Sequence, residues 1–412
     1  MKYGRLHSNS SLGGTQMTDK PRKNIAAIVT TYYPRSHADV IPTKYMAGFP
    51  TDEGLKLPRV NLASMYIDQK NERDIGYQLA ERYNIPVYTS ILKALTLEGG
   101  ELAVDGVLLI GEHGDYPYNE FNQHMYPRRH LFEQICGVFA SSGHSVPVFC
   151  DKHFAYNWPD AKWMYRRAKE LNVPLMAGSS LPTCWRTPYL EHELETPISG
   201  AVAIGYGGTE SYGFHALETL QCMIERRTGG ESGVVAVQAL SGDAVWAAGK
   251  NGLWDRELAD AACDIIENRI AKPLEASENP VAFLLEHSDR LRSAVLMLSS
   301  SDFAYACRTE DKILASEFYL QNGDPYAHFS YLGLNIEEMF LTGEAQYPAE
   351  RTLLTTGVLD AVMQSLHQGG VRLETPHLAE LSYQSYQKLP VRPLGPRPTG
   401  ATLDPWPPES AE

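Results

Sequence analysis

Two groups of polar side chains follow two short apolar runs near the middle of the chain. Residues 104–110 and 146–150 are rich in Val, Leu, Ile and Phe, which is typical of strands buried on both faces of a parallel sheet. The polar residues that directly follow these runs are Glu112, His113, Asp115, Asp151, Lys152 and His153. Ligands of parallel sheets bind outside the carboxyl ends of the strands. We therefore predict that these side chains share one cleft; the alternative is that they are ordinary solvated loop residues.

The elements that must position this cleft alternate between strand and helix patterns. Further strands are predicted at 24–31, 59–67, 85–88 and 173–177. Helical spacing of apolar residues predicts helices at 71–83, 91–97, 127–141 and 158–171. Such alternation is typical of α/β proteins, with helices covering both faces of a parallel sheet. We expect a Rossmann-like, doubly wound parallel sheet in this part of the chain.

The second half of the chain has a different pattern. It predicts longer strands at 198–205, 233–240, 294–298 and 316–320, and helices at 213–226, 253–268 and 349–367. We expect a second domain of α+β type with a large open, mostly antiparallel sheet. At 412 residues two domains are the default. The predicted organisation is a disordered leader at 1–23, domains at 24–180 and 181–385, and a Pro-rich tail at 386–412.

Composition excludes some classes of protein. The net charge of −14 argues against a nucleic-acid partner, because such proteins neutralise phosphates with Lys and Arg. No apolar run is long enough to cross a bilayer, and residues 1–24 contain no apolar stretch typical of a secretory signal. The six cysteines are scattered without a C-x-x-C pair, which favours free thiols in a cytoplasmic protein. A small molecule is the expected partner, and Met17 is an alternative start.

Four segments together resemble the glucose-fructose oxidoreductase/inositol dehydrogenase family, also called Gfo/Idh/MocA. Residues 79–88 (LAERYNIPVY) are similar to the family's second helix and third strand, and residues 104–110 (VDGVLLI) to the strand before its cofactor loop. Asp151-Lys152-His153 stands where the family has Glu-Lys-Pro, and Gly213-Phe-His215 resembles its G-x-H. The resemblance covers roughly residues 24–380.

This resemblance implies an enzyme that binds NAD or NADP and oxidises a sugar or polyol hydroxyl between two domains. It nominates Lys152 to stabilise the alkoxide and His215 to take the proton, with His153 beside them. The cofactor positions that it implies are Thr30, Thr31, Asp68, Glu112 and His113. It also implies a homo-oligomer formed through the open face of the second domain's sheet.

The chain departs from this family where the first strand ends. The family has G-x-G-x-x-G there, and residues 30–37 (TTYYPRSH) contain no glycine. Glycines permit the tight turn and the close approach of the backbone to the pyrophosphate, and Tyr32, Tyr33 and Pro34 obstruct it. The family's Asp four residues before the helix His is Ser211 here, and Glu210 is one position away. We therefore expect an atypical or lost dinucleotide site.

Two other functions remain open. His113, Asp151 and His153 carry groups that bind divalent metals, which would suit a non-redox epimerase, lyase or hydrolase. His37 is a further metal-capable residue. Aromatic residues that could stack on a sugar ring, or belong to the core, are Tyr116, Tyr118, Tyr126, Trp158 and Trp185. Arginines that could bind a carboxylate, or lie on the surface, are Arg128, Arg129 and Arg186. The third function is a non-catalytic ligand-binding or assembly subunit.

Overall fold

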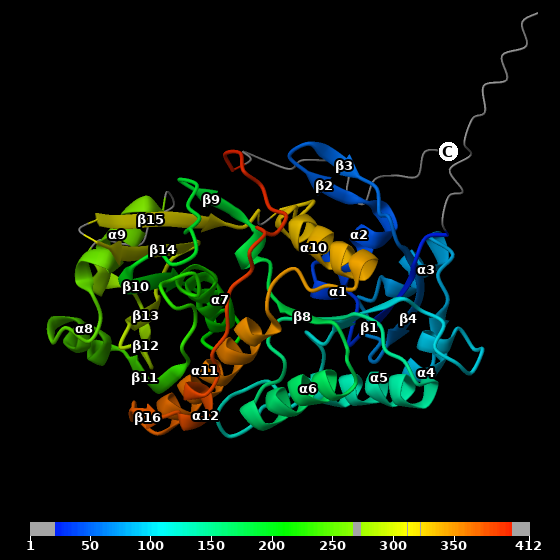
Figure 1. Ribbon diagram of the computed structural model, residues 1–412, viewed down its shortest axis with the longest axis horizontal. Helices are drawn as coiled ribbons and strands as arrows, with labels where there is room; N and C mark the ends of the chain where they lie inside the picture. Colours follow the sequence, from blue (N-terminus) through cyan, green and yellow to red (C-terminus); the bar gives the residue numbers. More distant parts are fainter. Residues whose placement is uncertain (1–20, 267–272, 311, 322, 398–412) are drawn as a thin grey trace, which may run out of the picture.

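The computed structural model describes residues 21–266, 273–310, 312–321 and 323–397. It contains two sheets that lie side by side, each covered by helices (Figure 1). The parallel sheet of the first half is on the right of the view, and the mostly antiparallel sheet of the second half is on the left. This arrangement confirms the predicted fold class. Most of the leader predicted at 1–23 and the end of the tail predicted at 386–412 lie outside the described residues.

The first sheet has six parallel strands in a doubly wound order. The strands are β1 (Asn24–Val29), β4 (Asn61–Ile67), β5 (Val87–Tyr88), β6 (Gly106–Ile110), β7 (Val148–Asp151) and β8 (Leu175–Gly178), and their order is β5-β4-β1-β6-β7-β8. Strands β4 and β5 are added on one side of β1, and strands β6, β7 and β8 are added on its other side, so the winding of the sheet reverses between β1 and β6. The last residues of these two strands, Val29 and Ile110, are paired. Such a reversal opens a crevice at the carboxyl ends of the two strands.

Helices cover both faces of this sheet because its strands alternate between them. Ile25, Ala27 and Val29 face one side, and Ala26 and Ile28 face the other. The first side is covered by α1 (His37–Val40), α2 (Pro42–Ala47), α3 (Gly76–Arg82) and α10 (His328–Thr342), and the second by α4 (Ile91–Thr96), α5 (Arg128–Ser142) and α6 (Trp158–Glu170). Helix α10 comes from the second half of the chain, so the halves are not fully separate.

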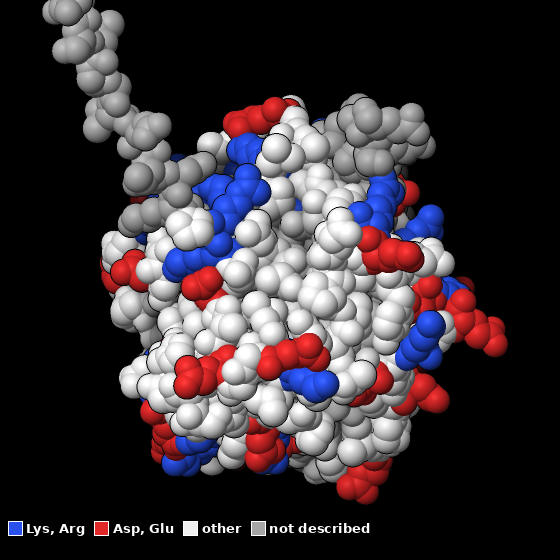
Figure 2. Space-filling model, turned by 90° about the vertical axis from the view of Figure 1, so that its right-hand side faces the viewer, with Lys and Arg blue, Asp and Glu red and all other residues white. Residues whose placement is uncertain are grey.

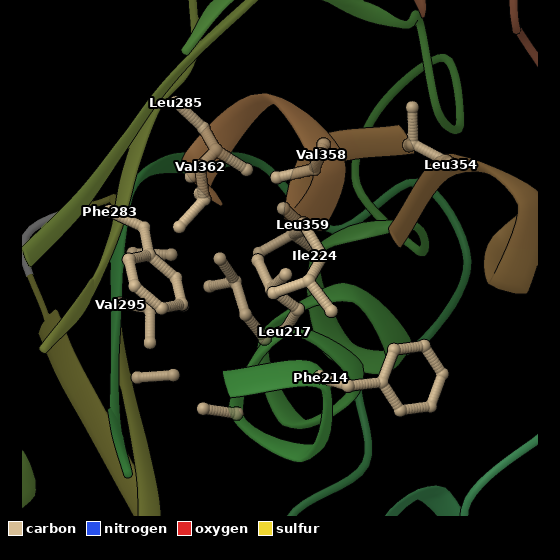
Figure 3. Packing of buried hydrophobic residues seen from close by; sticks show 14 of the residues in the cluster. Phe214, Leu217, Ile224, Phe283, Leu285, Val295, Leu354, Val358, Leu359 and Val362 are labelled. Atoms are coloured by element: carbon tan, nitrogen blue, oxygen red, sulfur yellow. The ribbon is translucent and has the colours of Figure 1, made fainter. Parts of the chain in front are cut away.

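The second sheet has eight strands, and all neighbours except β10 and β13 are antiparallel. In spatial order they are β16 (Leu373–Glu374), β11 (Val234–Ser241), β12 (Val281–His287), β13 (Arg292–Met297), β10 (Ile198–Gly205), β14 (Phe303–Thr309), β15 (Lys312–Tyr319) and β9 (Trp185–Thr187). Helices α7 (Gly213–Ile224) and α11 (Ala349–His367) pack on one face. Figure 3 shows Leu217 of α7 and Leu359 and Val362 of α11 between these helices and Phe283 and Val295 of the sheet.

The other face of the second sheet is covered in part by helices of the same chain. Residues of α8 (Asp243–Lys250) and α9 (Arg256–Ile265) form an apolar cluster with β10, β12, β13 and β14. This is the face expected to join subunits. The homo-oligomer stays a prediction, and the part of this face that helices leave uncovered is smaller than expected.

Figure 2 shows the end of the molecule formed by the first domain, where charged side chains surround a central area of uncharged residues.

Several elements differ from the sequence prediction. The segment 32–58 contains α1, α2 and a hairpin of β2 (Phe49–Thr51) and β3 (Gly54–Lys56). The helix predicted at 71–83 begins only at Gly76, because the Ile75 amide donates to the Tyr32 carbonyl. The helix predicted at 253–268 is α9, which begins after the Asp255 cap; residues 267–268 lie outside the described residues. The remaining short elements are η1 (Leu181–Thr183), η2 (Leu274–Ala276) and α12 (Pro376–Ala379).

The Pro-rich segment lies against the chain's own surface as far as residue 397. The Val391 amide donates to Asn335 of α10, and the Arg392 guanidinium pairs with Glu191. Among the described residues, no helix combines the length and the apolar character that a membrane span needs.

Candidate active site

A cavity of about 650 Å³ lies between the two domains at the carboxyl ends of β1, β6 and β7. Its walls come from the loops after these strands, from the loop between β10 and α7, and from the start of α7. This is the crevice that the doubly wound strand order predicts. The residues named from the sequence that line it are Glu112, His113, Lys152 and His215, together with His37, Tyr118 and Tyr126.

Glu112 carries a buried negative charge that two cations neutralise. Its carboxylate pairs with the fully buried Arg128 at the start of α5, and its Oε1 lies 3.2 Å from the Lys152 ammonium. Burial alone would raise the pKa of Glu112, but Lys152 and Arg128 outweigh it and hold this pKa well below its usual range. The preceding residue must be small, because a Cβ at Gly111 would lie 2.5 Å from the Arg128 side chain.

Lys152 connects the two domains. Its backbone has φ of 64° and its amide donates to the carbonyl of Gly178, the last residue of β8, so the side chain leaves the line of strand β7. The ammonium donates to the Ser211 carbonyl of the second domain at 3.2 Å. An ammonium has three donors. Glu112 and Ser211 account for two of them, which leaves one for a ligand in the cavity.

His215 lies in the first turn of α7 and is 8% exposed. Burial, and next the Lys152 charge, keep its pKa well below the ordinary value, so the ring is neutral at pH 7. Its Nδ1 atom has no hydrogen-bond partner among the described residues. The residue also lines the cavity, where the ring can meet a ligand.

The neighbours of Lys152 in the Asp-Lys-His segment turn away from the cavity. Asp151 is fully buried, and its carboxylate Oδ2 lies 2.6 Å from Nδ1 of His37. His153 is also buried, where its Nε2 accepts from Arg128 and lies 3.3 Å from Glu210. Burial, followed by the Arg128 charge, lowers the pKa of His153. His153 thus orients charged residues behind the cavity wall.

His113, Asp151 and His153, the predicted metal set, are engaged in different places. His113 lines the cavity, and burial lowers its pKa to about 4. Asp151 bonds His37, and His153 bonds Arg128. Within the described parts of the chain, no three His, Cys, Asp or Glu side chains are arranged to hold a metal ion.

Three of the nominated cofactor residues, Thr30, Thr31 and Asp68, lie at the ends of β1 and β4 and bond to the chain itself. The Thr30 hydroxyl donates to the Glu112 carbonyl at 2.8 Å, and Thr31 accepts from Asn71. The Asp68 carboxylate accepts from two phenols, Tyr66 and Tyr116, at 2.8 and 2.7 Å. The Tyr116 phenol thus lies where a ribose hydroxyl would have to bond.

The loop after β1 does not fit a dinucleotide pyrophosphate held by backbone amides. The Arg35 amide donates to the Asp39 carboxylate at 2.8 Å, the Tyr33 amide donates to the Ser36 hydroxyl, and Pro34 has no N–H. Tyr32 is fully buried and bonds Thr43. A carboxylate therefore takes an amide that a phosphate would need, and its charge repels an anion.

Aromatic residues form another wall of the cavity. Tyr118, His124 and Tyr126 stack in that order, with ring centroids 4.2 and 4.0 Å apart. The other nominated aromatic and cationic residues lie elsewhere: Trp185 is buried against Asp52, Trp158 packs on His377, Arg129 pairs with Asp160, and Arg186 pairs with Glu191.

The sequence indicates His37 as a metal-capable group and Arg128 as a carboxylate-binding candidate, and it assigns no role to Glu210 or Tyr212. His37, Glu210 and Tyr212 line the cavity, and Arg128 supports Glu112 from behind. No local motif marks these residues. Glu210 stands one position from the acidic residue expected before the helix His, and that offset was the one available signal.

Comparison with known proteins gives matches to solved structures alone. No protein-family model matches the chain, and no curated protein matches it. GenD2 from gentamicin A biosynthesis, solved with NAD, is 12% identical; the alignment covers 90% of this chain and 99% of that one, with a TM-score of 0.57. A putative myo-inositol dehydrogenase from Sinorhizobium meliloti 1021 is 12% identical, with coverages of 85% and 99% and a TM-score of 0.53.

An oxidoreductase from Agrobacterium radiobacter, solved with NAD⁺, L-tartaric acid and magnesium, is 15% identical over 86% of this chain and 98% of that one, with a TM-score of 0.52. Likeness at such identities shows the fold. The chain shares the two-domain fold of these structures, among them the putative myo-inositol dehydrogenase, as the resemblance to Gfo/Idh/MocA predicts. The activity of this chain is a separate question, because one fold hosts many functions.

Proposed function

We propose that the chain is an oxidoreductase-type enzyme that acts on a small hydroxylated or keto compound, such as a sugar or polyol, in the interdomain cavity. The observation that carries this proposal is the placement of Lys152 and His215, which come from different domains and line one cavity at the sheet's switch point. Tyr118 and Tyr126 offer the polar-edged aromatic surface on which sugar rings stack.

The two groups have complementary chemistry. The free donor of the Lys152 ammonium can bond a substrate hydroxyl and stabilise the alkoxide that forms when the proton leaves. A neutral cavity imidazole, for which the resemblance nominates His215, can accept that proton. Glu112 keeps the ammonium in place, because it is a buried carboxylate held ionised by two cations.

An oxidation also needs an acceptor for the hydride. NAD or NADP is supported by the fold, since structures of the same fold were solved with NAD. For a dinucleotide to bind in the usual crevice, Asp39 must release the Arg35 amide and Tyr116 must leave Asp68. This requirement makes dinucleotide binding the decisive measurement.

A second candidate is favoured by the same loop. If these contacts persist, the cavity can still move protons without hydride transfer, as an epimerase or lyase does. Lys152 and a cavity histidine would then act on a proton next to a carbonyl. The filled loop after β1 is the specific observation for this candidate.

A thermal-shift titration separates the two candidates. The purified chain is melted with NAD⁺, NADH, NADP⁺ and NADPH, and then with a panel of sugars, polyols and sugar acids. A ligand that binds only the folded state raises the melting temperature. A rise with one dinucleotide supports the oxidoreductase, whereas rises with sugar-like compounds alone support the second candidate. No rise with any compound at millimolar concentration contradicts both.

A pair of matched variants tests the site itself. Lys152→Met removes the cavity ammonium, and Lys162→Met removes an exposed one on α6. We expect the first to lower turnover about 100-fold or more, as loss of a transition-state donor does, and the second to leave it unchanged. Equal activity of both variants would rule out a catalytic role for Lys152.

A further inference from the structure

A histidine and an aspartate form a close pair at the edge of the cavity. Asp151 is the last residue of β7, and His37 is the first residue of α1. The Asp151 side chain is wholly buried, and its Oδ2 lies 2.6 Å from His37 Nδ1, while the His37 side chain is 13% exposed and lines the cavity. The carboxylate is therefore behind the ring, and the cavity is in front of it.

The ring cannot turn freely because side chains from other elements contact it. Phe329 of α10 meets it edge-on with centroids 5.4 Å apart, and His113 of the loop after β6 meets it edge-on at 5.5 Å. Asp151 is confined as well, since its backbone belongs to the sheet and pairs with Gly178. Packing and the short bond together fix which ring nitrogen faces the cavity.

A carboxylate at Nδ1 fixes the tautomer of a neutral imidazole. It accepts the Nδ1 proton, so the unprotonated nitrogen is Nε2. Among the described residues, the hydrogen bond of the His37 ring is the one that Nδ1 makes with Asp151. The lone pair of Nε2 is thus available to a molecule in the cavity.

We propose that His37 is a general base of this cavity and that Asp151 is its positioning residue. In the proton transfer, the substrate O–H bond breaks, the proton bonds to Nε2, and the electron pair stays on the oxygen beside the Lys152 ammonium. The Asp151 carboxylate stabilises the resulting imidazolium. The inference rests on the proposed function, in that both place chemistry in this cavity, but it assigns the proton to a different residue.

His215 lacks these features. It has no carboxylate at Nδ1, and burial disfavours its protonated form. The assignment therefore goes to His37, whose Nδ1 bonds the Asp151 carboxylate. Ionisable groups that interact with His37 from other elements are Glu112, which Lys152 and Arg128 neutralise, and His113, His215 and His328, whose pKa values burial lowers. On its own helix, Asp39 accepts from the Arg35 amide.

Diethyl pyrocarbonate, which acylates unprotonated imidazole nitrogens, tests the pair without a known substrate. Trypsin releases residues 36–44, a peptide whose one histidine is His37, so mass spectrometry can follow its labelling. We expect His37 to react faster than His215, and its rate to fall about tenfold in Asp151→Asn while the His215 rate stays unchanged. Equal rates for the two histidines, or a His37 rate that Asp151→Asn does not alter, would overturn the inference.

Turnover of a compound found with the ligand panel gives a second readout. His37→Gln should lower kcat about 100-fold or more with little change in KM, and His144→Gln, at an exposed histidine, should change neither. Full activity of a folded His37→Gln variant would contradict the assignment. If Lys152→Met is also fully active, the proposed function fails; if Lys152→Met is inactive and His37→Gln active, only the base is wrong.

Discussion

Arg128 is the residue on which the charge balance behind the cavity depends. It is 0% exposed, it pairs with Glu112, and it donates to His153. Removing one partner of a buried ion pair leaves the other charge uncompensated, which costs far more than loss of a surface pair. The adjacent Arg129 is 37% exposed and pairs with Asp160 at the surface, so it provides a matched comparison.

We predict that Arg128→Met lowers the free energy of unfolding by about 3–5 kcal/mol, because Glu112 then keeps Lys152 as its one cation. Arg129→Met should lower it by at most about 1 kcal/mol. Urea denaturation of both variants measures the difference. Equal costs would show that Arg128 and Glu112 are not a buried pair.

A second residue-scale prediction concerns Glu218, a fully buried carboxyl on α7. Burial raises its pKa from 4.5 to about 7. Between these values the folded state binds more protons than the unfolded state, so this group's contribution to stability is complete below pH 4.5 and is lost as the pH rises through 7. The effect is on the order of 1–3 kcal/mol.

Glu218→Gln should remove this loss. The Gln oxygen can accept from the Ser179 amide, and its NH₂ can donate to Thr352, whose own proton goes to the Ala177 carbonyl. We expect the variant to gain stability over the wild-type chain as the pH rises from 5 to 8, measured as melting temperature. Glu380→Gln, at an exposed carboxyl, serves as the control, and a parallel pH dependence for all three chains would contradict the prediction.

At the scale of elements, helix α10 packs from the second half of the chain onto the first sheet. Phe340 of α10 packs on Gly106 at the start of β6, and a Cβ there would lie 2.5 Å from the ring. A Cβ added at Gly137 of α5 would have no neighbouring atom within 4 Å. We therefore expect alanine at these two positions to have opposite effects on the free energy of unfolding.

Gly106→Ala should destabilise the protein by about 1–3 kcal/mol through overpacking, and Gly137→Ala should stabilise it by about 0.5–1 kcal/mol through helix propensity. The double variant Gly106→Ala/Phe340→Leu should recover part of the loss, because the smaller side chain relieves the contact. Urea denaturation gives all three values. A Gly106→Ala variant as stable as the wild-type chain would mean that α10 does not pack on β6.

At the scale of the whole molecule, Asp360 of α11 joins the second domain to the loop between β6 and α5, which carries Tyr118 and Tyr126. Its two oxygens accept from the Trp158 amide at the start of α6 and from the Gln123 amide group. Gln123 cannot reverse its amide, since its oxygen accepts from Asn119, whose own oxygen accepts from the Phe121 and Gln123 backbone amides. This polar chain leads to the loop that carries the stacked tyrosines.

Asp360→Asn should cost about 1–3 kcal/mol, because one donor would then face another donor. Glu350→Gln on the same helix makes the same chemical change, but the Gln oxygen can keep the bond from the Tyr165 hydroxyl, so its cost should stay below about 1 kcal/mol. The comparison is made by urea denaturation. If Asp360→Asn cost no more stability than Glu350→Gln, the fixed orientation of the hydrogen bonds from Asp360 through Gln123 to Asn119 would be refuted.

The sequence determined the sheet, its helices and half of the site. Residues 104–110 and 146–150 are apolar on both faces, so they had to be buried parallel strands, and Glu112 and Lys152 had to follow at their ends. The helix at 349–367 was correct to the residue, since its bounds are set by local signals. Local patterns suffice wherever the cause of a structure lies within a few residues.

Tertiary structure alone decided which side chains enter the cavity. Asp151, Lys152 and His153 are consecutive, yet strand alternation and the positive φ at Lys152 send one of the three into it. His37 meets Asp151 across 114 positions, and α10 packs on a sheet more than 200 positions away in the chain. No local pattern encodes such pairs, because their stability comes from burial and charge compensation between elements that only folding brings together.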